Sequence, residues 1–351
     1  MGNKCRLIAC EEAWTIPEIA EELRKVSRGP SQSADKLLVG GIYDADHDSS
    51  GYGKMNFLEG LKDVEGQRLS QMDEFGVDMH LLTLTAPGVQ MFDADTATEL
   101  AALSNDRLAE ICRKRPDRFA GLASFAPHSP KRAAKEIDRV MTDLGMNGLI
   151  VNGHTNGDYF DDPKFWPIFE AAEAHDATIY IHPRGPSDTL KGPMMDYAMD
   201  SAMWAYGVEV GTNILRMMAG GVFDQFPKLR ICVGHMGEMV PFFIWRINFM
   251  NSRAQKVGRA PKTQRSMEEY FRDNFVFTTS GVEDPLALRY AIDRMGIDNV
   301  IWAIDYPYQP MKPAVDFIEN FECTDAERHA LCHGNAERVF HIAPTRANAS
   351  T

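Results

Sequence analysis

Four carboxylate or imidazole side chains each come directly after a short apolar run typical of a buried strand: Glu11, His182, His235 and Asp305. A buried ionised carboxylate is costly unless it is paired or bound to a metal, so Asp305, which follows residues 299–304, needs a partner. Glu11, His182 and Asp305 together offer one imidazole and two carboxylates. This set suits a divalent ion such as Zn²⁺ or Mn²⁺, with Mg²⁺ as a third candidate.

His235 belongs to a second group, because Glu238 follows it by three residues in the run Gly234-His235-Met236-Gly237-Glu238. Glu238 can hydrogen-bond a ring nitrogen of His235, which fits a proton-relay pair as well as a metal site. The structural alternative is a packed histidine followed by a glutamate that begins the next helix. The spacing alone leaves these interpretations open.

The elements that must position these side chains alternate regularly along the chain. We predict about eight strands, each followed by a helix, which is typical of a (β/α)₈ barrel. No GxGxxG motif follows any strand, so a dinucleotide-binding fold lacks its fingerprint. The carboxyl ends of barrel strands share one face, where active sites are built, and we expect the four side chains to converge there. The predicted strands are 6–10, 78–84, 119–125, 148–152, 178–181, 230–234, 275–279 and 299–304.

Two long insertions, residues 27–66 and 183–206, follow the first and fifth predicted strands. Both would lie over the active face, and long irregular insertions in compact domains are usually functional or form oligomer contacts. We therefore expect one barrel domain over residues 1–344, a flexible tail over 345–351, and a homodimer or homotetramer.

Composition excludes several classes of partner. The 351 residues carry a formal net charge of −13, and no stripe of Lys and Arg offers a nucleic-acid footprint. No apolar stretch approaches the ~20 residues of a membrane span, and the N-terminus lacks the apolar region of a signal peptide. The six cysteines form no CxxC pair and are interpreted as structural. We expect a cytoplasmic protein that acts on a small molecule.

Several motifs carry a resemblance to a known family. The chain resembles the amidohydrolase superfamily, from Glu11-Glu12-Ala13 to Asn335-Ala336-Glu337, in the runs Tyr180-Ile181-His182-Pro183, Val233-Gly234-His235-Met236-Gly237-Glu238 and Asp305-Tyr306-Pro307-Tyr308. More narrowly it resembles the metal-dependent, non-oxidative aryl-acid decarboxylases, which include the 5-carboxyvanillate, γ-resorcylate and 2,3-dihydroxybenzoate enzymes. Two stretches look most similar to the 5-carboxyvanillate enzymes: Asn152-Gly153-His154-Thr155-Asn156-Gly157 and Trp245-Arg246-Ile247.

The resemblance implies roles for individual residues. Glu11, His182 and Asp305 match the family's metal ligands, and His235 and Glu238 match its hydrogen-bonding relay. In this branch the substrate is a small aromatic carboxylate, and the acid that protonates its ring would be Asp305.

The predicted substrate contacts are Arg246, Tyr308 and Asn152. Arg246 matches an arginine that holds the substrate carboxylate, in some members from the neighbouring subunit, and Tyr308 matches a residue near the substrate. Ala13 stands where many superfamily members have a second histidine ligand, as it does in several decarboxylases. The fourth strand ends at Asn152 without a bridging lysine, so we expect one divalent ion per subunit.

We predict a divalent-metal-dependent decarboxylase of an ortho-hydroxy aromatic carboxylic acid, in which Asp305 protonates the ring carbon before carbon dioxide leaves. Two alternatives stay open. One is a metal-dependent hydrolase or hydratase that acts on a lactone or an unsaturated carboxylic acid. The other is a non-enzymatic barrel that binds an aromatic acid without turnover.

Overall fold

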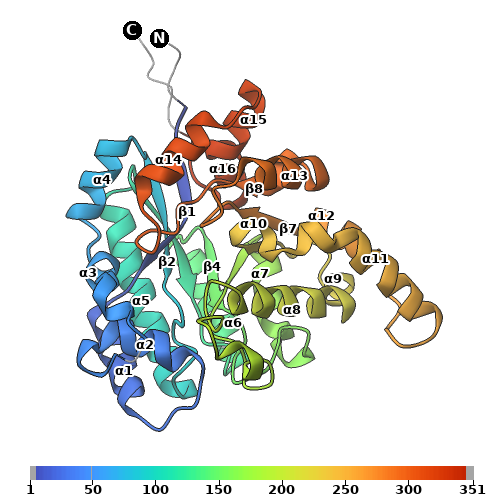
Figure 1. Cartoon of the computed structure of the whole chain (residues 1–351), viewed down its shortest axis with the longest axis horizontal. Helices are drawn as coiled ribbons and strands as arrows, with labels where there is room; N and C mark the ends of the chain where they lie inside the picture. Colours follow the sequence, from blue (N-terminus) through green and yellow to red (C-terminus); the bar gives the residue numbers. More distant parts are fainter. Residues whose placement is uncertain (1–4, 49, 345–351) are drawn as a thin grey trace.

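Eight parallel strands form one sheet at the centre of the molecule (Figure 1). The computed structural model describes residues 5–48 and 50–344. Each strand pairs with the next along the chain, and helices lie between the strands, as the predicted (β/α)₈ barrel requires. The strands are β1 (Ile8–Trp14), β2 (Met79–Leu84), β3 (Phe119–Ser124), β4 (Gly148–Asn152), β5 (Ile179–His182), β6 (Ile231–Val233), β7 (Phe275–Thr278) and β8 (Val300–Ile301).

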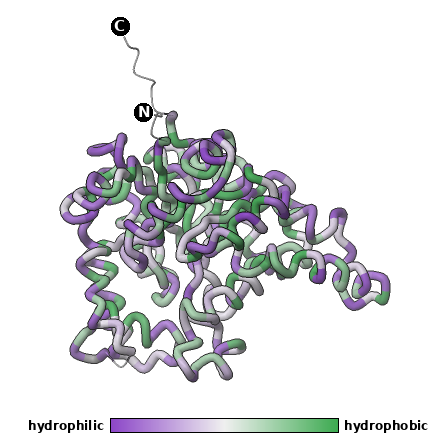
Figure 2. The backbone as a smooth tube through the Cα atoms, turned by 45° about the horizontal axis from the view of Figure 1, so that its top comes forward, coloured by the Kyte–Doolittle hydropathy of each residue, from purple (hydrophilic) through white to green (hydrophobic). Residues whose placement is uncertain are grey.

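Helices cover the outside of the sheet, so the strands are buried on both faces. Every residue of β2, β3, β4 and β7 is buried, which explains why these strands appear in the sequence as nearly continuous apolar runs. The outer helices alternate between hydrophilic and hydrophobic stretches, as amphipathic helices with one buried face do (Figure 2). The longer ones are α1 (Pro17–Arg28), α4 (Gln67–Phe75), α5 (Ala94–Lys114), α6 (Pro130–Thr142), α7 (Trp166–Ala174), α8 (Ala205–Ala219), α11 (Val240–Lys256), α12 (Met267–Asn274), α13 (Pro285–Met295) and α14 (Met311–Asn320).

The first and last strands differ from their predicted bounds. β1 continues past Glu11 to Trp14, and its register against β2 shifts between Ala9 and Glu12. A register shift of this kind is a bulge, which re-aims side chains beside active sites. Glu11 therefore lies within β1 rather than after it. At the other end β8 is only two residues long, and Asp305 lies in the turn beyond it.

The two insertions contain more regular structure than their sequences indicate. Residues 27–66 include α2 (Asp35–Tyr43) and α3 (Phe57–Lys62), whose short apolar stretches do not show a helical period over a long window. The second insertion leads into α8. The predicted tail, 345–351, lies outside the described residues. Among the described helices, none combines the length and the apolar character needed to cross a bilayer.

Helix α11 projects away from the barrel (Figure 1). Its exposed surface is unusually apolar, because it carries five large hydrophobic side chains that are each 45% to 65% exposed: Phe242, Phe243, Trp245, Phe249 and Met250. The rings of Trp245 and Phe249 stack on one another with centroids 5.3 Å apart. Contiguous exposed apolar surface of this kind commonly marks a protein contact.

Candidate active site

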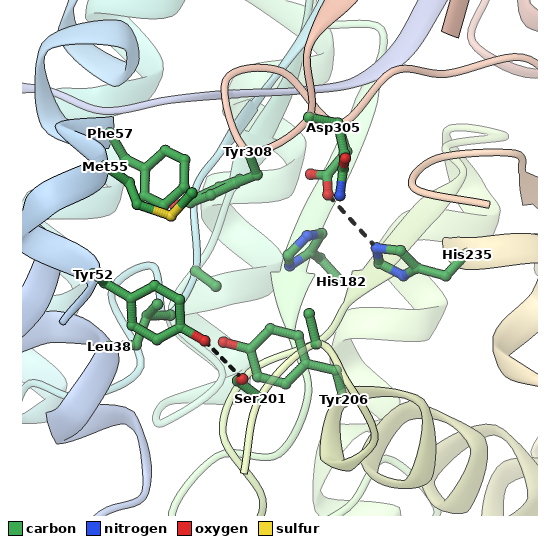
Figure 3. Close-up of a pocket in the computed structure, with 13 residues that line it drawn as sticks. Leu38, Tyr52, Met55, Phe57, His182, Ser201, Tyr206, His235, Asp305 and Tyr308 are labelled. Atoms are coloured by element: carbon green, nitrogen blue, oxygen red, sulfur yellow. Dashed lines mark hydrogen bonds and ion pairs between the residues drawn. The ribbon is translucent and has the colours of Figure 1, made fainter. Parts of the chain in front are cut away.

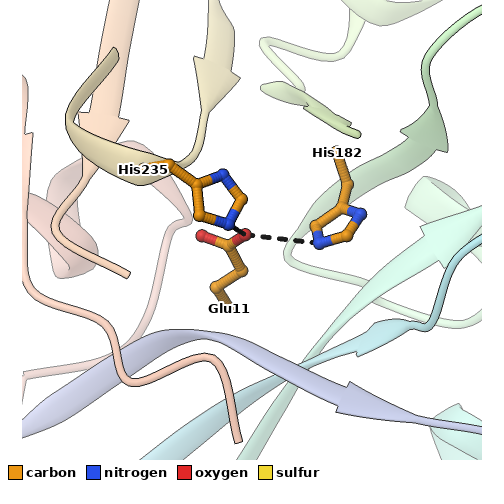
Figure 4. Close-up of side chains that lie close together, drawn as sticks. All are labelled: Glu11, His182 and His235. Carbon is orange, nitrogen blue, oxygen red and sulfur yellow. Dashed lines mark ion pairs between the residues drawn. The ribbon is translucent and has the colours of Figure 1, made fainter. Parts of the chain in front are cut away.

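Three of the four predicted side chains meet at the carboxyl ends of the strands (Figure 4). Glu11 comes from β1, His182 ends β5, and His235 follows β6. Oε1 of Glu11 lies 3.4 Å from Nε2 of His182 and 3.5 Å from Nε2 of His235. One ligand atom from each residue falls within 4.8 Å of the others, which is compact enough to hold a metal ion.

The other ring nitrogen of each histidine is already engaged. Nδ1 of His182 lies 2.7 Å from the carbonyl oxygen of Pro183, which can only accept, so Nδ1 carries the proton. Nδ1 of His235 lies 2.8 Å from Oε1 of Glu238 and donates to that carboxylate in the same way. Both arrangements leave the Nε2 lone pair facing Glu11. Metal-binding histidines are commonly oriented by such an outer hydrogen bond.

The two oxygens of Glu11 have different surroundings. Oε2 accepts hydrogen bonds from the hydroxyls of Tyr180, Thr278 and Ser280. Oε1 is buried and has no hydrogen-bond partner among the described residues. A buried carboxylate oxygen left free is costly, and here it faces two imidazole lone pairs. This donor set fits a divalent ion such as Mn²⁺ or Zn²⁺.

Asp305 lies beside this group and completes the predicted set (Figure 3). Its Oδ2 is 3.9 Å from Nε2 of His235. Its backbone adopts the left-handed conformation, with φ of 76°, which is uncommon for a residue with a Cβ and directs the turn after β8. The sequence reasoning placed Asp305 among the ligands and His235 in a relay, whereas the closest three-residue group contains His235.

Burial and neighbouring charges move the pKa values of these groups in opposite directions. Burial alone would raise the pKa of Glu11, but His235 and His182 bring it below its usual value. Burial raises the pKa of Asp305 despite the opposing effect of His235. Burial would lower the pKa of His235, but Glu238 and Glu11 raise it well above the usual value. Groups with shifted pKa values that gather in a cleft are typical of catalytic sites.

A pocket of about 240 Å³ opens next to the metal-ligand group (Figure 3). Both insertions help to line it, so they cover the active face as predicted. Tyr308 lies in the wall, with its ring centroid 4.9 Å from that of Phe57 and its hydroxyl 2.6 Å from Oγ1 of Thr85. The lining is mostly apolar and aromatic: Leu38, Tyr52, Met55, Phe57, Ala86, His182, Ser201, Ala202, Tyr206, His235, Asp305, Tyr308 and Gln309.

Two predicted substrate contacts do not line this pocket within the chain. Arg246 is exposed on the projecting helix α11. Asn152 is buried at the end of β4, where its backbone N–H donates to Oε1 of Gln90 at 2.7 Å. Their contact with substrate stays a prediction.

The hydroxyl groups that hold Glu11 were not predicted from the sequence. Tyr180 precedes His182 by two residues on β5, and Thr278 precedes Ser280 by two at the end of β7. Side chains two apart on a strand share a face, so this period could have indicated both pairs. Their common partner could not be inferred, because it lies on β1.

The fold is a (β/α)₈ barrel with a possible metal-ligand group at the rim of the sheet where the strands end, the place where barrel enzymes build their active sites. A family model described as amidohydrolase matches residues 61–342, and the chain belongs to the amidohydrolase family. The 5-carboxyvanillate decarboxylase of Sphingomonas paucimobilis is 50% identical, with a TM-score of 0.94 over 97% of this chain and 100% of that one.

Two further relatives support the same branch. The 5-carboxyvanillate decarboxylase of Novosphingobium aromaticivorans, solved with manganese and 4-hydroxy-3-methoxy-5-nitrobenzoic acid, is 34% identical with a TM-score of 0.91 over 96% of each chain. The γ-resorcylate decarboxylase of a Polaromonas species is 35% identical over 80% of this chain and 89% of its own length. Within the family, the chain belongs to the aryl-acid decarboxylases, which are carbon–carbon lyases.

Replacing Glu11 with glutamine tests the metal site directly. Glu11→Gln keeps the side-chain shape but removes the charge that two imidazoles face, so we expect manganese bound per chain to fall at least about tenfold. The measurement is metal content after loading with Mn²⁺ and desalting. Glu319→Gln, an exposed change on α14, is the control and should leave metal content unchanged. Full occupancy in Glu11→Gln would exclude Glu11 as a ligand.

Proposed function

We propose that this protein is a divalent-metal-dependent decarboxylase of 5-carboxyvanillate, with Mn²⁺ as the first candidate ion. The observation that carries the proposal is the 50% identity to the Sphingomonas paucimobilis enzyme over nearly the whole of both chains. The pocket supports it, because a ring fits between apolar walls beside a carboxylate and imidazole cluster. Zn²⁺ and Mg²⁺ are the other candidate ions.

Glu11, His182 and Asp305 would hold one ion per subunit. Nε2 of His235 belongs to the compact group with Glu11 and His182 and lies 3.9 Å from Oδ2 of Asp305, so it would face the same ion. When bound, the ion supplies positive charge beside the phenolic oxygen and the neighbouring carboxylate of the substrate. Phe57 and Tyr308, whose rings pack against one another, would form one apolar wall beside the aromatic ring and exclude water. The ring carbon that bears the carboxylate would then face Asp305.

Asp305 would act as the proton donor. A carboxylate that binds a cation is normally ionised, so Asp305 would take a proton by way of His235 as substrate enters and would then act as the general acid. The proton moves to the ring carbon that bears the carboxylate, and aromaticity is lost. The bond to the carboxylate carbon then breaks, carbon dioxide leaves, and the electron pair returns to the ring, which restores aromaticity. Asp305 is left as a carboxylate.

His235 and Glu238 would return a proton to Asp305. His235 lies between the two carboxylates, with Nδ1 on Glu238 at 2.8 Å and Nε2 3.9 Å from Asp305. Because one ring nitrogen faces Glu238 and the other faces Asp305, the imidazole can pass a proton from one side to the other. The same pair also fixes which nitrogen faces the pocket.

Arg246 would bind the second carboxylate of the substrate in the pocket of a neighbouring copy. Among the described residues, those that line the pocket include no lysine or arginine, yet 5-carboxyvanillate carries two carboxylates. Arg246 lies on the projecting helix α11, among the exposed side chains of Phe242, Phe243 and Trp245. A homodimer or homotetramer that covers this apolar surface would also deliver the missing cation.

The first test measures carbon dioxide release by purified protein loaded with Mn²⁺, Zn²⁺ or Mg²⁺. The substrates are 5-carboxyvanillate, γ-resorcylate, 2,3-dihydroxybenzoate and salicylate. We expect 5-carboxyvanillate to be turned over fastest, and we expect release to stop when the metal is chelated. If metal-loaded protein releases no carbon dioxide from any of them, a hydrolase or hydratase becomes the better proposal. Ring binding without turnover and without metal would favour a binding protein.

Asp305→Asn tests the proton donor. The amide cannot supply the proton, so we expect the rate of carbon dioxide release to fall by about 10²- to 10⁴-fold. Thermal unfolding should change little, since the two side chains have the same size. Asp316→Asn, an exposed change on α14, is the matched control. An Asp305→Asn enzyme as fast as the wild type would exclude Asp305 as the acid.

Arg246→Ala tests the contact across subunits. Loss of a charged hydrogen bond should raise KM about 10- to 100-fold with a smaller effect on kcat. Arg253→Ala, two turns along the same exposed helix, is the control. Unchanged KM would exclude the role.

Mixing two defective enzymes locates the contact. In a mixed dimer, the Asp305→Asn subunit supplies Arg246 to the pocket of its Arg246→Ala partner, which keeps Asp305. Half of the dimers are mixed after random reassembly, and each has one complete site of two. About a quarter of wild-type activity should therefore return at limiting substrate. No recovery, with mixed dimers confirmed by mass, would place Arg246 in its own chain's pocket or outside any pocket.

A further inference from the structure

The contact between the first and last strands of the barrel is unlike the other seven. Among the described residues, β1 and β8 share no ladder of paired backbone groups, although every other neighbouring pair does. One backbone hydrogen bond joins the two segments, from the N–H of Ala13 to the carbonyl oxygen of Tyr306 at 2.7 Å. The remaining connection is made by a side chain, that of Glu12.

Glu12 binds the backbone on both sides of Asp305. Its Oε1 accepts from the N–H of Ile304 at 3.0 Å, and its Oε2 accepts from the N–H of Tyr306 at 3.1 Å. The Glu12 carboxylate thus accepts hydrogen bonds from the backbone N–H groups of the residues on either side of Asp305. That residue, Asp305, has a left-handed backbone, which a side chain with a Cβ adopts only where its surroundings enforce it.

The carboxylate of Glu12 is itself held in place. It is 0% exposed, and Nδ1 of the equally buried His80 lies 3.9 Å from Oε2. The guanidinium of Arg68 donates to the carbonyl oxygen of Ala13 at 2.6 Å and lies 4.7 Å from the centre of the Tyr306 ring. Glu12 is therefore enclosed by buried neighbours, and Arg68 helps to hold the backbone of Ala13 and the ring of Tyr306 beside it. Buried groups with several fixed partners are suited to hold a neighbour rigidly.

We propose that Glu12 is a positioning residue for the reaction: its carboxylate clamps the two peptide groups around Asp305 and so aims the proton donor at the substrate ring. This inference rests on the proposed role of Asp305 as the acid. Glu12 lies outside the pocket lining and touches none of the predicted ligand atoms, although its Oε1 also accepts a long hydrogen bond from the backbone N–H of Glu11 at 3.4 Å. An effect on the rate that leaves bound manganese unchanged would therefore pass through Asp305 rather than through Glu11.

Glu12→Gln is the variant of choice. Glutamine keeps the shape, but its NH₂ group cannot accept from a peptide N–H, so one of the two clamping bonds is lost. We expect kcat to fall about 10- to 100-fold because the donor is misplaced, while KM and bound manganese stay within about twofold. We also expect a larger solvent deuterium isotope effect on kcat, since proton transfer becomes slower relative to the other steps.

Glu209→Gln is the matched control. Glu209 is equally buried, at 0% exposed, and it also accepts from a backbone N–H, that of Ser187 at 3.2 Å, but it does not contact the turn that carries Asp305. We expect its kcat and isotope effect to match the wild type. A merely structural loss would instead lower stability in both variants without enlarging the isotope effect in either.

Each outcome decides between the two proposals. If Asp305→Asn is inactive but Glu12→Gln has wild-type kcat and isotope effect, the positioning role is wrong and the proposed function stands. If Asp305→Asn keeps full activity, the proposed role of the acid fails first. A fall in kcat with unchanged isotope effect, or with lost manganese, would also overturn the positioning role.

Two further measurements test the positioning role if Glu12→Gln does not fold well. Glu12→Asp keeps the charge but withdraws the carboxylate by one methylene group, so the same fall in kcat and rise in isotope effect are expected. If neither variant folds, amide exchange in the wild-type holoenzyme decides. The N–H groups of Ile304 and Tyr306 should exchange as slowly as those of Val300 and Ile301, and rapid exchange would exclude the clamp.

Discussion

The burial of the Glu11 carboxylate is the constraint on which the site depends. An ionised group that is 1% exposed cannot rely on water, so the protein must supply its partners. Three hydroxyls from β5 and from the end of β7 satisfy one oxygen. The second oxygen is left to face two imidazoles. That asymmetry makes a metal-ligand group possible: a fully satisfied carboxylate would have no oxygen to offer, and an unsupported one would not stay ionised.

The barrel fold brings these side chains together. Parallel strands that pair in sequence order bring their carboxyl ends to one rim, so residues from β1, β5 and β6 meet although they are far apart in the chain. The same rim receives Asp305 from beyond β8, where the short strand ends early and a turn takes over. The strands position Glu11, His182 and His235, and Glu12 binds the turn that carries Asp305. Placing these residues on the strands of one sheet and on the turn after β8 keeps their separation constant.

Within the described part of the chain, the pocket lacks a cation, and helix α11 exposes one among apolar side chains, so the two surfaces complement one another. The pocket walls are apolar and aromatic and include no lysine or arginine among the described residues, so a dianionic ring would lack a partner for its second carboxylate. Helix α11 carries an arginine amid exposed aromatic side chains, which is unfavourable for a chain alone in water. Association of two copies would bury that apolar surface and bring a cation to the pocket, which links assembly to substrate recognition.

The sequence by itself determined the alternation of strands and helices and the positions of His182, His235 and Asp305 near strand ends, because period and strand-end placement are local properties of the chain. It also carried the family resemblance. Only the tertiary structure decided that β1 continues through Glu11 with a bulge, that Tyr180, Thr278 and Ser280 share one oxygen, that His235 joins the closest ligand group, and that Glu12 holds the Asp305 turn. These depend on register between strands distant in sequence, which no local pattern encodes.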